Sequence, residues 1–492
     1  MIVSFALCFR VILKCYPERS EGSLNQYIRK KDMLHRFKNN GYSIVLDVAS
    51  GSVHVVDDLV YDILGMYDES TGEADRDKVT EAIKEKYGGQ YSDEDIDDAF
   101  SDIEELKASG QLFTEDSYKD VVIDFKKRKT VVKALCLHMA HDCNLACKYC
   151  FAEEGTYHGQ PRELMSEEVG KRALDFLIEN SGSRVNLEVD FFGGEPLMNF
   201  EVVKKLVAYG REREKETGKN FRFTLTTNGM LLNDEVIDFC NEEISNVVLS
   251  LDGRKEVNDL MRPTPNGKGS FDVIVPKFKR FVEKRGDKSY YLRGTFTRNN
   301  LDFYEDFKCM ADMGFKEISI EPVVAPADSP YAIREEDIPK ICEEYDKLAK
   351  DLIERKKAGK PVTFFHFKLD LTGGPCVYKR LSGCGSGTEY LAVTPSGDLY
   401  PCHQFVGLDG FKLGTVFNGV DNTEVVDEFK CCNVYAKDKC RECFARFYCS
   451  GGCAANSYQF HGHILDAYDI GCELQRKRIE CAIMIKAAEA DM

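Results

Sequence analysis

The segment that decides the fold is His141-Asp-Cys143-Asn-Leu-Ala-Cys147-Lys-Tyr-Cys150, in which three cysteines follow the spacing C-x3-C-x2-C. Three thiolates this close together on a short loop can bind three corners of one metal centre. Tetrahedral zinc sites favour paired C-x2-C motifs with four ligands, and no fourth cysteine follows directly downstream here. A 4Fe–4S cluster held by three cysteines would leave one iron open for a substrate or cofactor. A zinc knuckle, or cysteines that merely pack, are the alternatives.

A second motif lies about forty residues further on, in Asp190-Phe-Phe-Gly-Gly-Glu-Pro196, where a strand-like run ends in a glycine turn. The cysteine loop likewise follows an apolar run, at residues 134–140. With both motifs in this order, the sequence resembles the radical S-adenosylmethionine (SAM) enzymes. The resemblance implies that Cys143, Cys147 and Cys150 bind the catalytic cluster and that SAM chelates its open iron.

The same resemblance assigns candidate contacts to SAM at the ends of several strands. These candidates are Tyr149, Gly193, Gly194, Glu195, Pro196, Asn228, Ser250 and Asp252. The Gly-Gly-Glu-Pro turn is expected to contact the methionine amine. For Asn228 and Asp252 the alternative is ordinary turn chemistry, because each is followed by glycine.

Residues 134–323 alternate between strand and helix patterns. Strands are expected at 134–140, 186–192, 221–227, 246–251, 290–297 and 317–323, with amphipathic helices such as 166–180 and 201–217 between them. Six βα units fit a parallel, partly closed barrel, whose catalytic groups gather at the carboxyl ends of its strands. We therefore predict an α/β fold with a partial (β/α)6 radical SAM barrel over 130–333. A charged linker helix region at 334–372 is expected to follow it.

The N-terminal region divides into two parts. Residues 1–40 are interpreted as an extension outside the fold, either translated from a start upstream of Met33 or disordered. In 41–123 a predicted hairpin precedes helices at 58–67, 77–87 and 92–109, which resembles the winged-helix element that captures leader peptides by strand addition. An inert domain is the alternative, whereas its acidic character argues against a DNA-reading winged helix.

Cysteines return at 373–492 in an ordered pattern. They are Cys384, Cys402, Cys440, Cys443, Cys449, Cys453 and Cys472. The pattern resembles the SPASM domain, which carries two auxiliary iron–sulfur clusters in many radical SAM enzymes. The resemblance implies one cluster, nearer the substrate, on Cys384, Cys402 and Cys453, and another on Cys440, Cys443, Cys449 and Cys472.

The nearer auxiliary cluster has no assured fourth ligand. Cys376, eight residues before Cys384, is one candidate. Alternatively, the fourth iron is open and ready for a thiolate of the substrate. Zinc knuckles are the alternative for the stretch Cys440–Cys453.

Composition excludes several classes of function. With 492 residues, 43% hydrophobic and 30% charged, the chain is expected to form about two to four globular domains. The net charge of −17 argues against nucleic acid and anionic membranes as partners. Twenty cysteines in cluster-like spacings favour metal binding in a reducing cytoplasm over disulfides. No apolar run is long enough to predict a transmembrane helix.

The order of domains narrows the implied reaction. In the anaerobic sulfatase maturases an aspartate directly follows the second SPASM cysteine, whereas here His403 follows Cys402. Leader-binding element, barrel and SPASM domain together resemble the thioether-forming maturases of six-cysteine (SCIFF) peptides. This resemblance is carried by phrases such as Ser43-Ile-Val-Leu-Asp-Val-Ala-Ser-Gly-Ser-Val53 and Gly383-Cys-Gly-Ser-Gly-Thr-Glu-Tyr390.

The implied activity is the joining of cysteine sulfurs to carbons of acceptor residues, by family likeness threonines, in a ribosomally made cysteine-rich precursor. The implied cofactors are SAM and three 4Fe–4S clusters. The implied partners are the precursor, bound through its leader, and a one-electron donor such as a flavodoxin or ferredoxin. The alternatives are carbon–carbon crosslinking, formylglycine formation, or a non-enzymatic iron–sulfur or zinc scaffold.

Overall fold

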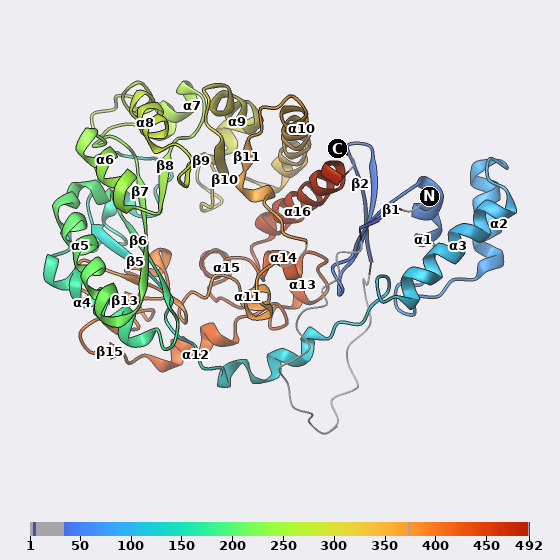
Figure 1. Ribbon diagram of the computed structural model, residues 1–492, viewed down its shortest axis with the longest axis horizontal. Coiled ribbons are helices and arrows are strands. Elements are labelled where there is room, and N and C mark those ends of the chain that lie inside the picture. Colours follow the sequence, from blue (N-terminus) through green and yellow to red (C-terminus); the bar gives the residue numbers. More distant parts are fainter. Residues whose placement is uncertain (1–2, 6–33, 372–373, 491) are drawn as a thin grey trace.

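The computed structural model describes residues 3–5, 34–371, 374–490 and 492 (Figure 1). Within these ranges, no helix is long and apolar enough to cross a membrane. Most of the predicted extension, residues 6–33 with its proposed start at Met33, lies outside the described residues.

Six parallel strands lie side by side in chain order and form the centre of the molecule (Figure 1). They are β5 (Ala134–Ala140), β6 (Asn186–Gly193), β7 (Asn220–Thr227), β8 (Asn246–Ser250), β9 (Tyr290–Phe296) and β10 (Glu317–Pro322). Each bound lies within one residue of its prediction, because β6, β7 and β9 alternate between buried and less buried positions and β5, β8 and β10 are short apolar runs. On β7, Phe221, Phe223 and Leu225 are buried in the core, while Thr226, the next residue, lines a cavity. The predicted α/β barrel architecture is confirmed.

Helices cover the outer side of these strands (Figure 1). They are α4 (Glu167–Asn180), α5 (Phe200–Thr217), α6 (Asp234–Glu243), α7 (Lys255–Met261), α8 (Phe271–Arg285) and α9 (Phe303–Asp312). Their starts have local causes: the side chain of Ser166 accepts from the backbone N–H of Val169, and that of Asn233 from Val236. Such caps satisfy backbone donors that a helix leaves free at its first turn.

The sheet continues past the barrel at both edges. Strand β11 (Thr363–Phe364) pairs in parallel with β10, and β12 (Tyr390–Val393) pairs in parallel with β5. Beyond β12 follow β13 (Asp398–Tyr400), β14 (Gly414–Thr415) and β15 (Gly419–Val420), all antiparallel. These strands satisfy backbone groups that an open barrel would leave unpaired at its edges. The C-terminal region is therefore hydrogen-bonded to the barrel and is not a separate appendage.

The C-terminal region otherwise consists of short helices, turns and one long helix. The helices are α11 (Val377–Ser382), α12 (Thr423–Cys431), α13 (Asp438–Arg441), α14 (Arg446–Cys449), α15 (Ala454–His461) and α16 (Asp469–Ala490). A 3₁₀ helix at Tyr118–Lys127 runs beside α12 on the way from the N-terminal domain to the barrel.

The predicted charged linker helix is present as α10 (Ile338–Lys357), but one of its faces is buried. Ile341, Tyr345 and Leu348 are fully buried along one face. This face packs against α16, where Arg478 Nε donates to the hydroxyl of Tyr345 at 2.8 Å. The region 334–372 therefore fastens the end of the chain to the barrel and does more than link two domains.

The N-terminal sheet has the order β1-β4-β3-β2. Its strands are β1 (Val3–Phe5), β2 (Leu34–Asn39), β3 (Tyr42–Asp47) and β4 (Val53–Val56), and α1 (Asp58–Leu64), α2 (Arg76–Tyr87) and α3 (Asp93–Ala108) follow. The expected hairpin and three helices are there. Strand β2 was missed, since the expected domain began at residue 41. Its sequence signal is Asn40-Gly41, both with positive φ (47° and 87°), a pair typical of a two-residue hairpin turn.

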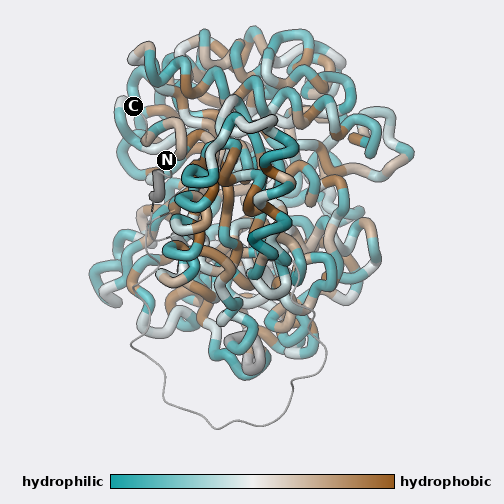
Figure 2. The backbone as a smooth tube through the Cα atoms, turned by 90° about the vertical axis from the view of Figure 1, so that its right-hand side faces the viewer, coloured by the Kyte–Doolittle hydropathy of each residue, from teal (hydrophilic) through white to brown (hydrophobic). Residues whose placement is uncertain are grey.

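This sheet buries both of its faces. Leu34, Val45 and Val56 pack in one cluster with α1–α3, whereas Phe37 and Ile44 belong to the main core. In Figure 2, which views the molecule from this side, hydrophilic residues cover the outer turns of the front helices and hydrophobic residues follow the strands. Polar contacts join the sheet to the rest of the chain: His35 Nε2 lies 2.9 Å from Glu480, and Asn39 Nδ2 donates to Asp346 at 2.8 Å.

Candidate active site and cysteine groups

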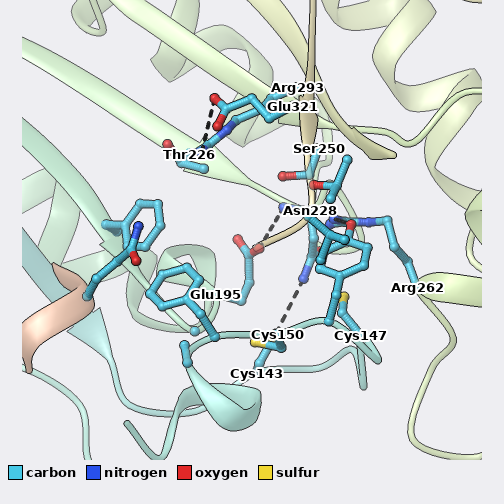
Figure 3. A pocket seen from close by; sticks show the side chains of 18 of the residues that line it. Cys143, Cys147, Cys150, Glu195, Thr226, Asn228, Ser250, Arg262, Arg293 and Glu321 are labelled. Carbon is cyan, nitrogen blue, oxygen red and sulfur yellow. Dashed lines mark hydrogen bonds and ion pairs between the residues drawn. The ribbon is translucent and has the colours of Figure 1, made fainter. Parts of the chain in front are cut away.

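A cavity opens at the carboxyl ends of the barrel strands and encloses about 1240 Å³, part of it open solvent (Figure 3). Of the residues predicted from the sequence, it is lined by Cys143, Cys147, Tyr149, Cys150, Gly193, Gly194, Glu195, Asn228 and Ser250. Residues more than a hundred positions apart in the chain therefore come together at the carboxyl ends of the parallel strands, as the barrel architecture predicts.

The three-cysteine loop is fixed by backbone contacts to the end of α7 and to the residues that follow it. Ala146 N donates to Pro263 O at 2.8 Å, and Lys148 N donates to Met261 O at 2.9 Å. Burial raises the pKa of Cys143 to about 12 and that of Cys147 to about 11. Without a metal these thiols would be neutral at pH 7, whereas a bound metal deprotonates a coordinating thiol outright. The donor set of three soft sulfurs at a cavity wall fits an iron–sulfur cluster with one open iron.

The glycine turn packs directly on the backbone that leads into Cys143. A Cβ atom at Gly193 would lie 2.4 Å from the carbonyl oxygen of Ala140, and one at Gly194 would lie 2.1 Å from that of Asp142. No other residue fits this crossing, and Gly193 also adopts a φ of 125° that favours glycine. The crossing places Glu195 beside the cysteine loop, where its backbone N–H donates to Asp142 O at 2.9 Å.

Glu195 is a fully enclosed acceptor. One carboxylate oxygen accepts from Thr227 Oγ1 (2.7 Å) and Leu197 N (3.1 Å), and the other accepts from Asn228 N (2.8 Å). Burial outweighs these hydrogen bonds and raises the pKa of Glu195 to about 7. Among the described residues Glu195 forms no ion pair with a cation, and a rigid acceptor of this kind is suited to a ligand with an amine.

Asn228 shows the turn chemistry that was one of its two interpretations, and its contact to SAM stays a prediction. Its Oδ1 accepts from Met230 N at 2.9 Å, which is turn chemistry. Its Nδ2 donates to Asn144 Oδ1 at 2.8 Å and points to Cys143 Sγ at 3.7 Å, which also ties the turn to the cysteine loop.

Two predicted contacts do not line the cavity. Pro196 is buried at the start of a 3₁₀ turn. Asp252 is completely buried behind Tyr149, whose hydroxyl donates to its carboxylate at 2.6 Å. Asp252 also accepts from Thr295 N at 3.0 Å, so in this structure it orients the tyrosine and does not face the cavity.

Several lining residues were missed from the sequence. The main ones are Thr226, Arg262, Arg293, Thr295, Glu321, Gln404 and Gln459. Arg262 Nη1 donates to the Tyr149 hydroxyl at 2.9 Å, and its buried Nε has no partner among the described residues. Arg293 and Glu321 form an ion pair at 3.3 Å across the cavity from the cysteines (Figure 3). The available signal was a polar residue at alternate positions of a strand, as Arg293 and Thr295 are on β9.

A second group contains four cysteines predicted to act together. Cys440, Cys443, Cys449 and Cys472 line one cavity of about 810 Å³, part of it open solvent, between α13, α14 and the start of α16. Burial raises the pKa of Cys440 to about 12 and that of Cys472 to about 11.

A third group lies around Cys384. Burial, then the neighbouring Cys453 and Cys384, raises the pKa of the Cys402 thiol, so the three predicted cysteines lie within electrostatic reach of one another. Cys384 lines a third cavity, and the other cysteine on its wall is Cys432, which was not singled out from the sequence. Cys376 is exposed at the start of α11 and does not line this cavity. In the part of the chain that the structure describes, no three His, Cys, Asp or Glu side chains are arranged to hold a single metal ion.

Comparisons with known proteins agree with this geometry. Residues 137–306 match the family model of the radical SAM superfamily. The chain is 30% identical over 192 residues to an uncharacterized protein of Methanocaldococcus jannaschii, a match that covers 39% of this chain and 62% of that relative. It is 25% identical over 337 residues to a cysteine-type anaerobic sulfatase-maturating enzyme of Clostridium novyi, covering 64% of this chain and 86% of the relative.

Among solved structures, native anSMEcpe with bound AdoMet and Kp18Cys peptide superposes with a TM-score of 0.60 at 21% identity. The superposition covers 73% of this chain and 99% of that one, and it shows a shared fold. The family model covers most of the barrel, so the barrel of this chain is similar to radical SAM enzymes in sequence as well as in fold.

Proposed function

We propose that this chain is a radical SAM maturase that installs thioether crosslinks in a cysteine-rich precursor peptide. The observation that carries the proposal is the cavity at the strand ends. Three cysteines and the Glu195 turn form one wall, and Gln404 and Gln459 of the C-terminal region form part of another. A peptide in this cavity would lie between the SAM-binding cysteines and the region that holds the auxiliary cysteines.

When bound, SAM and its cluster would supply the hydrogen-abstracting radical and leave as methionine and 5′-deoxyadenosine. The atoms and electrons of the reaction then balance as follows. The C–H bond of the acceptor residue breaks, its hydrogen leaves in 5′-deoxyadenosine, and a C–S bond forms. The thiol proton leaves to a base, and the surplus electron would be taken up by an oxidised cluster held by the auxiliary cysteines. A flavodoxin or ferredoxin is the proposed donor of the electron that starts each turnover.

The residues of the chain have separate tasks in this proposal. Cys143, Cys147 and Cys150 hold the cluster, and Glu195 accepts hydrogen bonds from the SAM amine. Arg262 and Asp252 orient Tyr149 at the cavity wall through its hydroxyl. Cys384, Cys402 and Cys453 hold the nearer auxiliary cluster, and Cys440, Cys443, Cys449 and Cys472 hold the farther one.

His403 supports thioether formation over sulfatase maturation. It occupies the place where the sulfatase maturases are expected to carry an aspartate base. Burial, with a contribution from Arg293, lowers the pKa of His403 to about 4, and its Nδ1 lies 3.2 Å from the Tyr390 hydroxyl. A neutral, hydrogen-bonded imidazole replaces the carboxylate at this position.

Formylglycine formation is the second candidate, favoured by the similarity to sulfatase-maturating enzymes. The two reactions leave different products on a peptide. A thioether removes two hydrogens and leaves no free thiol at the donor cysteine. A formylglycine carries an aldehyde that reacts with a hydrazide probe. Mass spectrometry of a treated cysteine-rich precursor distinguishes them.

The cofactor assignment is tested by replacing Cys143, Cys147 and Cys150 together with alanine. Three 4Fe–4S clusters contain about twelve irons, so the variant should lose about one third of its iron and all cleavage of SAM. Cys240→Ala is a matched control, because Cys240 is a buried thiol on α6 that lines none of the described cavities. Continued production of 5′-deoxyadenosine by the triple variant would refute the central assignment.

Leader binding is proposed at the edge of β4. The short strand β1 pairs antiparallel along this edge, with Val3 opposite Val55, so the edge can accept an added strand. Strand addition supplies backbone hydrogen bonds and affinity but no chemistry. Removal of residues 1–33 would free the edge of its intramolecular competitor and should tighten binding of a leader peptide, measured by fluorescence anisotropy. Weaker binding after this truncation would place the leader elsewhere.

A further inference from the structure

Two cavities lined by auxiliary cysteines share a wall. Gly451 and Gly452 line both the cavity of Cys440, Cys443, Cys449 and Cys472 and the cavity of Cys384. They are the two residues just before Cys453, and both have positive φ (88° and 74°). A charged group fixed to this stretch of backbone lies near both cysteine groups.

Lys437 is fixed there. Its side chain donates from Nζ to the carbonyl oxygen of Gly451 at 2.9 Å, and the residue is only 2% exposed. It lines the cavity of Cys384, and its own carbonyl accepts from Cys440 N at 3.0 Å. Among the described residues no carboxylate forms an ion pair with it. Lysine is almost never fully buried unless it is paired, so this position calls for nearby negative charge.

The other cations around these cavities each have a carboxylate partner. Arg446 pairs with Asp116 at 3.3 Å, Arg128 pairs with Glu389 at 3.2 Å, and Lys439 pairs with Asp469 at 2.6 Å. The charge of each of these is largely balanced by its partner. Lys437 is also buried in these walls, but the negative charge that balances it would come from the cysteine thiolates of the two groups.

We propose that Lys437 is a positioning residue that raises the reduction potentials of both auxiliary clusters. This inference rests on the proposed function, which places clusters at the two cysteine groups. A reduced cluster carries one more negative charge than an oxidised one. A fixed ammonium nearby therefore stabilises the reduced form more, and the effect is strong where water is excluded. Both clusters would then accept the surplus electron of the reaction more readily.

The test uses Lys437→Met, Lys437→Gln and Lys437→Arg, each in the background of the Cys143, Cys147 and Cys150 triple alanine variant, so that auxiliary clusters alone contribute signals. Potentials are measured by electron paramagnetic resonance during redox titration. Lys437→Met should lower the reduction potentials of both auxiliary clusters. We expect the equilibrium between reduced and oxidised cluster to change by about tenfold or more toward the oxidised form, which is 59 mV for a one-electron couple. Lys437→Gln retains a hydrogen-bond donor for Gly451 but has no charge, so it should lower both reduction potentials as Lys437→Met does. Lys437→Arg keeps the charge and should leave both potentials unchanged.

Lys439→Met is the matched control. Lys439 lines the cavity of Cys440, but its side chain is 50% exposed and paired with Asp469, so its removal should leave both potentials in place. If Lys437→Met kept its full auxiliary iron and its potentials were unchanged, the role of Lys437 would be refuted and the proposed function would be unaffected. Loss of auxiliary iron in both neutral variants but not in Lys437→Arg would also overturn it and assign the charge to cluster assembly. If the parent protein itself contained no auxiliary iron, the proposed function would be refuted instead.

Discussion

At the scale of single residues, the fourth corner of the nearer auxiliary cluster depends on two cysteines. Cys376 is close to Cys384 in sequence but exposed just before α11, whereas Cys432 faces the same cavity as Cys384 from the end of α12. The thiol of Cys432 donates to Ile464 O at 3.4 Å, a weak contact that a metal could replace. Sequence proximity therefore favours one cysteine and the fold favours the other.

We expect Cys376→Ala to retain the full iron content and an unchanged auxiliary signal. Cys432→Ala should change the auxiliary signal in electron paramagnetic resonance, because it removes the thiol that faces the cluster corner. Added precursor should produce a similar change in the parent protein if its thiolate displaces Cys432. Loss of about four irons in Cys376→Ala would show instead that Cys376 completes a closed site.

A second residue-scale prediction concerns Asp190 on β6. Burial, with help from the charge of Glu188, raises the pKa of this carboxyl from 3.8 to about 6. Because the folded-state pKa is raised, the stability that the protonated form contributes is present below about pH 4 and is lost as pH rises through about 6. Asp190→Asn should therefore gain stability relative to the parent between pH 4.5 and 7.5, by at most about 3 kcal/mol. Melting temperatures across this range test it, and a constant difference would contradict it.

At the scale of elements, the packing of α10 on α16 joins the barrel to the end of the chain. Both helices present fully buried residues, such as Leu348 on α10 and Ile483 on α16. The buried face of α10 was not predicted from the sequence, because its apolar residues are separated by many lysines and glutamates. A helix with such a stripe buries it even when most of its surface is solvated.

Leu348→Ala should destabilise the protein by about 2–5 kcal/mol, since it leaves a cavity in a closed interface. Lys350→Ala, two residues away on the exposed face, should change stability by less than about 0.5 kcal/mol. Thermal midpoints of the two variants provide the comparison. Equal effects would mean that α10 is a solvated linker, as its composition suggested.

At the scale of the whole molecule, one sheet runs through the barrel and the C-terminal region. Strand β12 pairs in parallel with β5, with Cys136 opposite Ala392, so the region that holds the auxiliary cysteines is anchored beside the strand that precedes the three-cysteine loop. The N-terminal sheet contacts α16 from the other side. These contacts fix the three cysteine groups relative to one another.

We therefore expect that the chain does not divide into autonomous halves at residue 372. Residues 374–492 expressed alone should show little cooperative unfolding by circular dichroism, because β12 and α16 would lack the partners they pack against. Co-expression with residues 34–371 should restore it through association of the two fragments. A cooperative transition of the isolated C-terminal fragment would contradict this prediction.

The sequence by itself determined the local features of this protein. Short apolar or alternating runs set the six barrel strands to within one residue, and the cysteine spacings selected two groups, Cys143–Cys150 and Cys440–Cys472, that each line one cavity. Such features depend on neighbours along the chain, because strand periodicity and short metal-binding loops are local properties. The roles of these cysteines as cluster ligands stay predictions.

Only the tertiary structure decided which side chains face each cavity. It placed Asp252 behind Tyr149, joined Arg293 to Glu321 on adjacent strands, and brought Cys432 to the cavity of Cys384. It also set Lys437 in the wall between two cysteine groups. These outcomes depend on packing between segments far apart in the chain, and no local pattern encodes that packing. Because water is excluded there, an unpaired buried charge or hydrogen-bonding group costs free energy, so the packing decides which groups pair.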